Sequence, residues 1–171
     1  PLVASDEAHL HNACLVFDDQ GRQVARYDKI YLFAFRRGNE FYDESTLLEA
    51  GQDIVSFEGP CGRVGLSVCY DLRFPELYRR MGELALIVVP AAFTETTGRA
   101  HWEVLLRARA IENLCYVLAC GQGGEHPGGA RTFGHSMLID PWGEIVASMA
   151  LGEGVVGGDI EPDRLTSIRE G

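Results

Sequence analysis

The sequence lacks the features that would place the protein in a membrane, on a nucleic acid or outside the cell. None of its apolar stretches approaches the roughly 20 residues of a membrane span, and its N-terminus lacks the charged and then apolar layout of a signal peptide. Its 15 basic residues against 25 acidic ones give a net charge of −10, and the basic residues form no long run. A cytoplasmic protein without nucleic-acid or membrane partners is therefore expected.

Paired cysteines are also absent. The 5 cysteines are an odd number and none form a C-x-x-C pair, so neither a zinc site nor a disulfide framework is supported, and no metal or cofactor is predicted. Cys14, Cys115 and Cys120 lie in apolar runs, where a small buried thiol is expected, and Cys61 follows a Gly-Pro turn. Only Cys69 stands where an apolar run gives way to polar residues.

The apolar content predicts one folded domain over residues 1–171. Hydrophobic residues make up 46% of the chain, enough for a substantial core. Continuous apolar runs predict buried parallel strands at 84–89 and 115–120. Apolar spacing and helix-start residues predict helices at 75–81, 99–113 and 162–169. This combination indicates an α/β protein with a mixed sheet or two sheets.

Strand pairs joined by turns are predicted at three places: 12–17 with 23–27, 53–57 with 63–68, and 137–140 with 144–148. A last strand is predicted at 155–160. Residues 1–9 show no periodicity, and long loops are expected at 36–51 and 121–129. The first and last strand pairs share an Asp-x-x-Gly turn followed by Val-Ala at the same offsets. A duplication would place one such hairpin in each of two stacked sheets.

The chain is organised around Cys69. The apolar run 64–68 stops at this cysteine and Pro75 opens the segment after it, which predicts a strand, a sharp elbow and a helix. In such an elbow the residue at the carboxyl end of the strand is lifted out of the sheet, where α/β folds place nucleophiles. Lys29 also ends a strand run. A lysine beside Cys69 would favour the thiolate and stabilise an oxyanion, with the Tyr70 N–H as second donor, as acyl transfer requires.

A cysteine nucleophile also needs a general base. The carboxylates in the loop after the lysine, Glu44 and Glu40, are candidates. His101, His126 and His135 are alternatives that sequence spacing does not rank.

Asp71 and Arg73 follow the nucleophile in the elbow. A salt bridge between them would brace the turn. Alternatively, Arg73 or the pair Arg36-Arg37 binds a substrate carboxylate, for which a guanidinium group is well suited.

Five segments together resemble a known family. They are Tyr27-Asp-Lys29-Ile-Tyr31-Leu-Phe, Gly65-Leu-Ser-Val-Cys69-Tyr-Asp-Leu-Arg73-Phe-Pro-Glu-Leu-Tyr, Val89-Pro-Ala-Ala-Phe-Thr94, Trp102-Glu-Val-Leu-Leu-Arg-Ala-Arg109-Ala-Ile-Glu-Asn113 and His135-Ser-Met-Leu-Ile-Asp-Pro-Trp-Gly143. The chain resembles the carbon–nitrogen hydrolase (nitrilase) superfamily, and within it the Nit branch of ω-amidase and deaminated-glutathione amidase type. The likeness runs from residue 12 to residue 169.

The resemblance implies an α-β-β-α sandwich of the nitrilase type and a Glu-Lys-Cys triad, in which Lys29 and Cys69 match the lysine and the nucleophile. Glu44 matches a second glutamate of the family. A homodimer or higher homo-oligomer is also implied. The residues expected at the oxyanion and substrate are Tyr70, Arg73 and Thr94.

Parts of the family pattern have no counterpart in this sequence. The family's general-base glutamate belongs to a segment before residue 1, because Asp6 and Glu7 lack an apolar strand around them, and the C-terminus stops short of the family's usual tail. The chain is therefore expected to lack the first strand and helix of the fold, and to hydrolyse amides poorly or not at all until that segment is restored. Tyr31, where relatives usually carry histidine, and the less acidic stretch 34–37 are expected to alter the pocket rim.

The predicted function is hydrolysis of a linear C–N amide bond in a small carboxylate-bearing substrate. Cys69 would attack the carbonyl, ammonia would leave, and water would release the acid from a thioester. The alternative is a catalytically impaired module of the same fold that serves in protein association, which the missing base favours and the intact lysine and cysteine motifs oppose.

Overall fold

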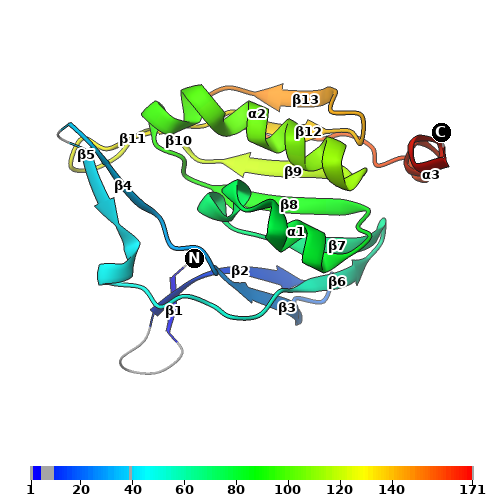
Figure 1. The fold of residues 1–171 in the computed structure, drawn as a ribbon, viewed down its shortest axis with the longest axis horizontal. Coiled ribbons are helices and arrows are strands. Elements are labelled where there is room, and N and C mark those ends of the chain that lie inside the picture. Colours follow the sequence, from blue (N-terminus) through cyan, green and yellow to red (C-terminus); the bar gives the residue numbers. More distant parts are fainter. Residues whose placement is uncertain (1, 5–9, 39, 171) are drawn as a thin grey trace.

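A six-stranded mixed sheet forms the centre of the molecule (Figure 1). The computed structural model describes residues 2–4, 10–38 and 40–170. The strand order is β13-β12-β9-β8-β7-β6, with β7, β8 and β9 parallel and their outer neighbours antiparallel. This arrangement confirms the predicted α/β class. The strands are β6 Ser56–Gly59, β7 Gly62–Leu66, β8 Leu86–Ala91, β9 Tyr116–Gly121, β12 Ser136–Ile139 and β13 Ile145–Met149.

Two helices, α1 (Pro75–Met81) and α2 (Glu95–Asn113), lie across one face of this sheet (Figure 1). Both predicted helices are confirmed, but α2 begins four residues earlier than its apolar spacing indicated. The reason is Thr94, whose side chain caps the helix by accepting a hydrogen bond from the Thr97 N–H. The stripe of α2 that is buried against the sheet includes Trp102, Leu106 and Ala110.

The opposite face of the sheet is partly covered by α3 (Pro162–Glu170), the predicted C-terminal helix. Its buried Leu165 packs in a second apolar cluster with Leu86, Tyr116 and Leu138. Because the parallel strands contribute to both clusters, they are apolar along their whole length and not in alternation.

A smaller sheet of order β1-β2-β3 lies beside the large one and contains β1 (Leu2–Ala4), β2 (Leu10–Phe17) and β3 (Gln23–Asp28). The predicted antiparallel pairing of β2 with β3 is confirmed. Tyr27 of β3 is fully buried in the main core, which joins the two sheets. The hairpins with the shared turn sequence therefore lie in different sheets, β2–β3 in the smaller and β12–β13 in the larger.

Several segments differ from the expectation of loops. The stretch 36–51 contains part of a hairpin, β4 (Ala34–Arg37) with β5 (Glu40–Asp43), followed by the 3₁₀ turn η1 (Glu44–Thr46). The glycine-rich stretch contains β10 (Gly123–Glu125) paired with β11 (Arg131–Phe133). Both hairpins are short and mostly exposed, so their sequences carry little apolar alternation.

The predicted strand at 155–160 is wrong, because these residues pair with no strand in the part of the chain that the structure describes. Val155 is 94% exposed, so its apolar side chain has no sheet to pack against. At the other end of the chain, β1 pairs with β2 although residues 1–9 show no periodicity. Asp6 and Glu7 lie outside the described residues.

Candidate active site

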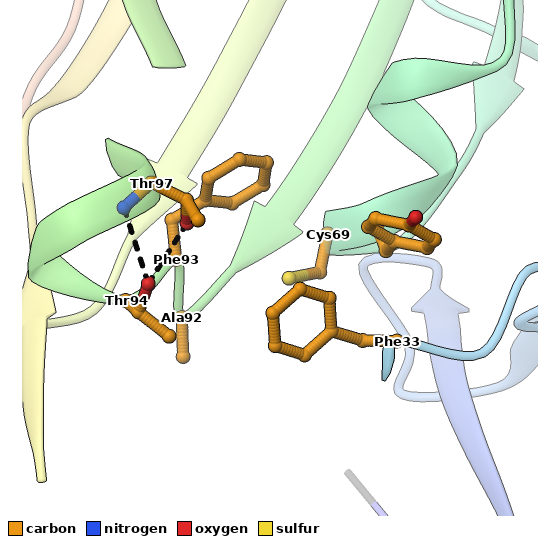
Figure 2. A pocket seen from close by; sticks show the side chains of 7 residues that line it. Phe33, Cys69, Ala92, Phe93, Thr94 and Thr97 are labelled. Carbon is orange, nitrogen blue, oxygen red and sulfur yellow. Dashed lines mark hydrogen bonds between the residues drawn. The ribbon is translucent and has the colours of Figure 1, made fainter. Parts of the chain in front are cut away.

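Cys69 stands at the turn between β7 and α1, as the elbow hypothesis predicts. It is the first residue of a 3₁₀ helix, η2 (Cys69–Arg73), and the residue before it is still extended. The φ of Cys69 is +53°, in the left-handed region that residues other than glycine rarely adopt. This reversal of the chain presents the thiol beyond the end of the strand, where Figure 2 shows the sulfur between Ala92 and Phe33.

The thiol faces a cavity of about 20 Å³, room for roughly one water molecule (Figure 2). The cavity lies at the edge of the sheet, because its lining residues come from the turn after β7 and from the turn after the neighbouring parallel strand β8. A larger groove of about 910 Å³ shares Cys69, Phe33 and Thr94 with it and also reaches Glu44. The residues that line the small cavity are Phe33, Cys69, Tyr70, Ala92, Phe93, Thr94 and Thr97.

Lys29 directly follows β3 and its side chain is 0% exposed. Its Nζ donates a hydrogen bond of 2.5 Å to Glu44 Oε2, which also accepts one of 2.7 Å from the Phe33 N–H. A buried ammonium group is stable only when it is paired in this way. The sequence prediction that Lys29 and Glu44 belong to one site is consistent with this pair.

The backbone of Lys29 is fixed on both sides. Its N–H donates to the Asn12 carbonyl at 2.8 Å and its carbonyl accepts from the Gly51 N–H at 2.8 Å. A Cβ atom at position 51 would lie 2.1 Å from the Asp28 carbonyl oxygen, so only glycine allows this approach. The backbone that carries the lysine side chain is therefore held in place on both sides.

The charges around Cys69 oppose one another. Burial raises the pKa of the Cys69 thiol, whereas the Lys29 ammonium and a hydrogen bond from the Ala92 N–H lower it, and the carboxylates of Glu44 and Asp71 raise it. The net direction is upward. The thiol therefore stays protonated near neutral pH until a base takes its proton.

Asp71 braces the turn, but not through Arg73 as the sequence suggested. Its fully buried carboxylate accepts hydrogen bonds from the Tyr27 hydroxyl and from the N–H groups of Tyr31 and Val68. The hypothesis of an Asp71–Arg73 salt bridge is therefore wrong. The donors could not be inferred from sequence because two of them are about forty residues away in the chain.

Arg73 contacts two of the residues that line the cavity but does not line it itself. Its guanidinium carbon lies 5.7 Å from the ring centres of both Tyr70 and Phe93, and its Nη2 is 3.2 Å from His101 Nδ1. Arg36 lies over the Phe41 ring in the β4–β5 hairpin. The arginine that lines the groove containing Cys69 is one that the sequence did not single out, Arg131.

The other predicted site residues separate into two groups. Thr94 lines both cavities, and its hydroxyl is 2.9 Å from the Thr97 hydroxyl. His101, His126 and His135 line neither of them. His135 instead stacks on Phe133 with ring centres 3.8 Å apart, and His126 contacts the Thr132 hydroxyl. Only the backbone of Glu40 is described, in β5.

Sequence analysis missed the apolar wall of the cavity, formed by Phe33, Ala92, Phe93 and, at its end, Thr97. The signal for three of them was available, because they follow the strand next to the one that ends near Cys69. The carboxyl ends of neighbouring parallel strands meet at one edge of a sheet. Phe33 follows the buried lysine by four residues, and nothing local distinguishes it from the other aromatic residues of that run.

The fold and the site define a class of α/β protein that carries a cysteine at the turn after a central strand, on the same groove as the glutamate of a buried lysine–glutamate pair. The carbon–nitrogen hydrolase family model matches residues 2–170, and the chain belongs to this family. Its relatives place it in the Nit branch of the nitrilase superfamily, which confirms the resemblance in the sequence.

Two of the relatives are named as amidases. The chain is 43% identical to a deaminated glutathione amidase of Synechocystis, over 98% of this chain and 64% of that protein. It is 40% identical to the human omega-amidase NIT2, over 99% of this chain and 62% of the relative. The crystal structure of the Caenorhabditis elegans NitFhit protein superposes with a TM-score of 0.88 at 43% identity, covering 97% of this chain and 41% of that one. The nitrilase fold is thereby confirmed, and the chain spans less than two thirds of these relatives.

Among residues 2–4, 10–38 and 40–170, no helix combines the length and apolar character needed to cross a membrane.

Proposed function

We propose that the protein hydrolyses the amide bond of a small carboxylate-bearing substrate through a thioester on Cys69, with release of ammonia. The observation that carries this proposal is the position of the Cys69 thiol on a cavity wall, under the electrostatic influence of the buried Lys29–Glu44 pair. The amidase relatives at 40–43% identity support the same reaction class.

The first half of the reaction forms the thioester. Glu44, the carboxylate that contacts Lys29 and lines the same groove as Cys69, accepts the thiol proton. The thiolate then attacks the amide carbon, and the negative charge on the oxygen is stabilised by the Lys29 ammonium and the Tyr70 N–H. The C–N bond breaks as the nitrogen takes a proton, and ammonia leaves.

The second half restores the enzyme. Water loses a proton to the carboxylate and attacks the thioester carbon, the C–S bond breaks, and the thiol regains a proton. The balance is one amide and one water consumed for one carboxylic acid and one ammonia.

Binding of the substrate uses the walls of the two cavities. Thr94 offers a hydroxyl group at the small cavity, and Arg73 holds the rings of Tyr70 and Phe93 that enclose it. Arg131 offers a largely exposed guanidinium group in the groove for the carboxylate of the substrate. We also expect copies of the chain to associate as a homo-oligomer, which light scattering measures directly.

The test is a single-turnover experiment with monoamides of short dicarboxylic acids. Over a long incubation the wild-type chain is expected to turn over slowly, to release up to about one ammonia per chain and to carry an acyl group on Cys69 when the reaction is quenched and weighed intact. Cys69→Ala is expected to lose both signals, with a fall in rate of roughly 10³-fold or more. Cys120→Ala, which removes an exposed thiol of the same groove, is the matched control and is expected to retain them.

Equal ammonia release by Cys69→Ala and wild type would contradict the proposal. Absence of both ammonia and adduct in wild type, together with alkylation of Cys69 no faster than that of Cys14, would favour the non-catalytic association module.

A further inference from the structure

The Asp71 side chain makes hydrogen bonds to both segments that bring chemistry to the cavity, the one that carries Lys29 and the one that carries Cys69. It sits in the middle of η2, two residues after Cys69, and its side chain is 0% exposed. Its two carboxylate oxygens accept three hydrogen bonds, from a tyrosine hydroxyl and two backbone N–H groups.

Two of these bonds hold the segment that carries Lys29. The Tyr27 hydroxyl donates to Asp71 Oδ2 at 2.8 Å, and the Tyr31 N–H donates to Oδ1 at 3.0 Å. The same tyrosine hydroxyl accepts a hydrogen bond of 3.2 Å from the Ile30 N–H. The chain is therefore fixed two residues before Lys29 and one and two residues after it.

The third bond holds the nucleophile. The Val68 N–H donates to Asp71 Oδ2 at 2.8 Å, directly before the strained left-handed residue Cys69. The carboxylate of Asp71 thus holds the turn that contains Cys69 and connects this turn to the segment that contains Lys29.

We propose that Asp71 is a positioning residue that fixes the Cys69 thiol relative to the Lys29 ammonium group. This inference rests on the proposed function, since it assigns to Lys29 and Cys69 a joint task. Asp71 does not touch the reacting atoms. It acts by holding in place the backbones of the two segments that carry Lys29 and Cys69.

The charge of Asp71 alone would act in the opposite direction. A carboxylate near Cys69 raises the pKa of the thiol, as Glu44 does, whereas Lys29 lowers it. Removal of the Asp71 charge without any movement would therefore make Cys69 more reactive near neutral pH. Loss of positioning would make it less reactive, because the thiol would lose the support of the ammonium group.

The experiment is the pH profile of Cys69 alkylation by iodoacetamide, read by peptide mass spectrometry. Asp71→Asn keeps the size of the side chain but presents an NH₂ group to donors, so it breaks at least one of the three bonds. The midpoint of the profile is expected to rise by about one pH unit or more, the size of effect that a nearby opposite charge exerts. A midpoint that falls or stays unchanged would overturn the proposal.

Tyr27→Phe gives a second and independent test, because it removes one hydrogen bond and leaves the Asp71 charge in place. A rise of the midpoint in this variant is expected, and an unchanged midpoint would contradict the proposal. Tyr78→Phe is the matched control, since Tyr78 is equally buried in the same core but is not a donor to Asp71. It is expected to leave the midpoint in place.

Cys115 reports on folding in the same samples. Burial raises its pKa to about 12, so it should escape alkylation as long as the core is intact. If Asp71→Asn exposes Cys115, Tyr27→Phe alone decides the question. Failure of the proposed function would appear separately, as absence of ammonia release in wild type, while the alkylation profiles would still test the positioning role.

Discussion

Lys29 is the residue whose charge matters most for the reactivity of the site. It is fully buried, its ammonium group is paired with Glu44, and its charge lowers the pKa of Cys69. Burial of the thiol has the larger and opposite effect. The thiolate fraction at neutral pH therefore depends on whether the ammonium group stays in place.

Lys29→Met tests this dependence with an apolar side chain of similar length. The pKa of Cys69 is expected to rise further, and because only the thiolate reacts, alkylation at pH 8 is expected to slow about tenfold or more. The rate should recover as the pH is raised through the new pKa. Arg26→Met is the control, since Arg26 lies on β3 just before Lys29 but pairs with the partly exposed Asp28. An unchanged Cys69 profile in Lys29→Met would show that the lysine does not act on the thiol.

At the scale of elements, the start of α2 is locked to β11 and through it to the cavity. Gly98 of α2 lies so close to Phe133 that an added Cβ atom would stand 2.3 Å from the Phe133 Cβ. The Phe133 N–H in turn donates to the Phe93 carbonyl at 2.9 Å, and Phe93 lines the cavity. The glycine thus allows a helix, a short strand and the wall of the site to pack together.

Gly98→Ala separates packing from helix propensity, because the two predict opposite signs. In an open helix the change would stabilise by about 1 kcal/mol. Here it is expected to lower the free energy of unfolding by about 1–3 kcal/mol, the usual cost of overpacking. Urea denaturation followed by tryptophan fluorescence measures the difference.

A double-mutant cycle identifies the origin of this cost. In a Phe133→Gly background, which removes the Phe133 Cβ atom as well as the ring, the clash is gone, so Gly98→Ala should become neutral or stabilising. A stabilising effect of Gly98→Ala in the wild-type background would contradict the close packing.

For the whole molecule, the sequence was sufficient where the governing contacts are local. The run 84–89 predicted a buried strand because every residue in it is apolar, and Pro75 marked the start of α1. The elbow at Cys69 was predicted for the same reason, since the change from apolar to polar residues occurs within a few positions. Lys29 and Glu44 also lie together as the sequence suggested.

Sequence reasoning failed where distant contacts decide the outcome. The segment 155–160 was predicted as a strand, yet it pairs with no strand among the described residues, and Val155 faces solvent. A salt bridge between Asp71 and its neighbour Arg73 was predicted, but the fold places the Tyr27 hydroxyl of β3 against the Asp71 carboxylate. Such choices depend on the assembled sheets and not on the sequence within one turn.

The C-terminal helix α3 shows how one side chain couples the end of the chain to the centre of the fold. Leu165 is buried on the second face of the sheet, and Arg169 extends past it to donate to the Leu84 carbonyl at 2.6 Å and the Leu114 carbonyl at 3.1 Å. These carbonyls precede β8 and β9, the two central strands. The helix therefore covers part of the face opposite to the one that carries α1 and α2.

Leu165→Ala is expected to lower the free energy of unfolding by about 2–5 kcal/mol, because it removes buried methyl groups and leaves a cavity over the sheet. Ser167→Ala, on the exposed side of the same helix, is the matched control and should change stability by about 0.5 kcal/mol or less. Urea denaturation followed by tryptophan fluorescence measures both.

If α3 belongs to the same cooperative unit as the core, Leu165→Ala should move the alkylation of buried Cys115 to lower urea by the same amount as the fluorescence transition. A fluorescence transition that stays in place would show instead that α3 detaches without disturbing the sheet.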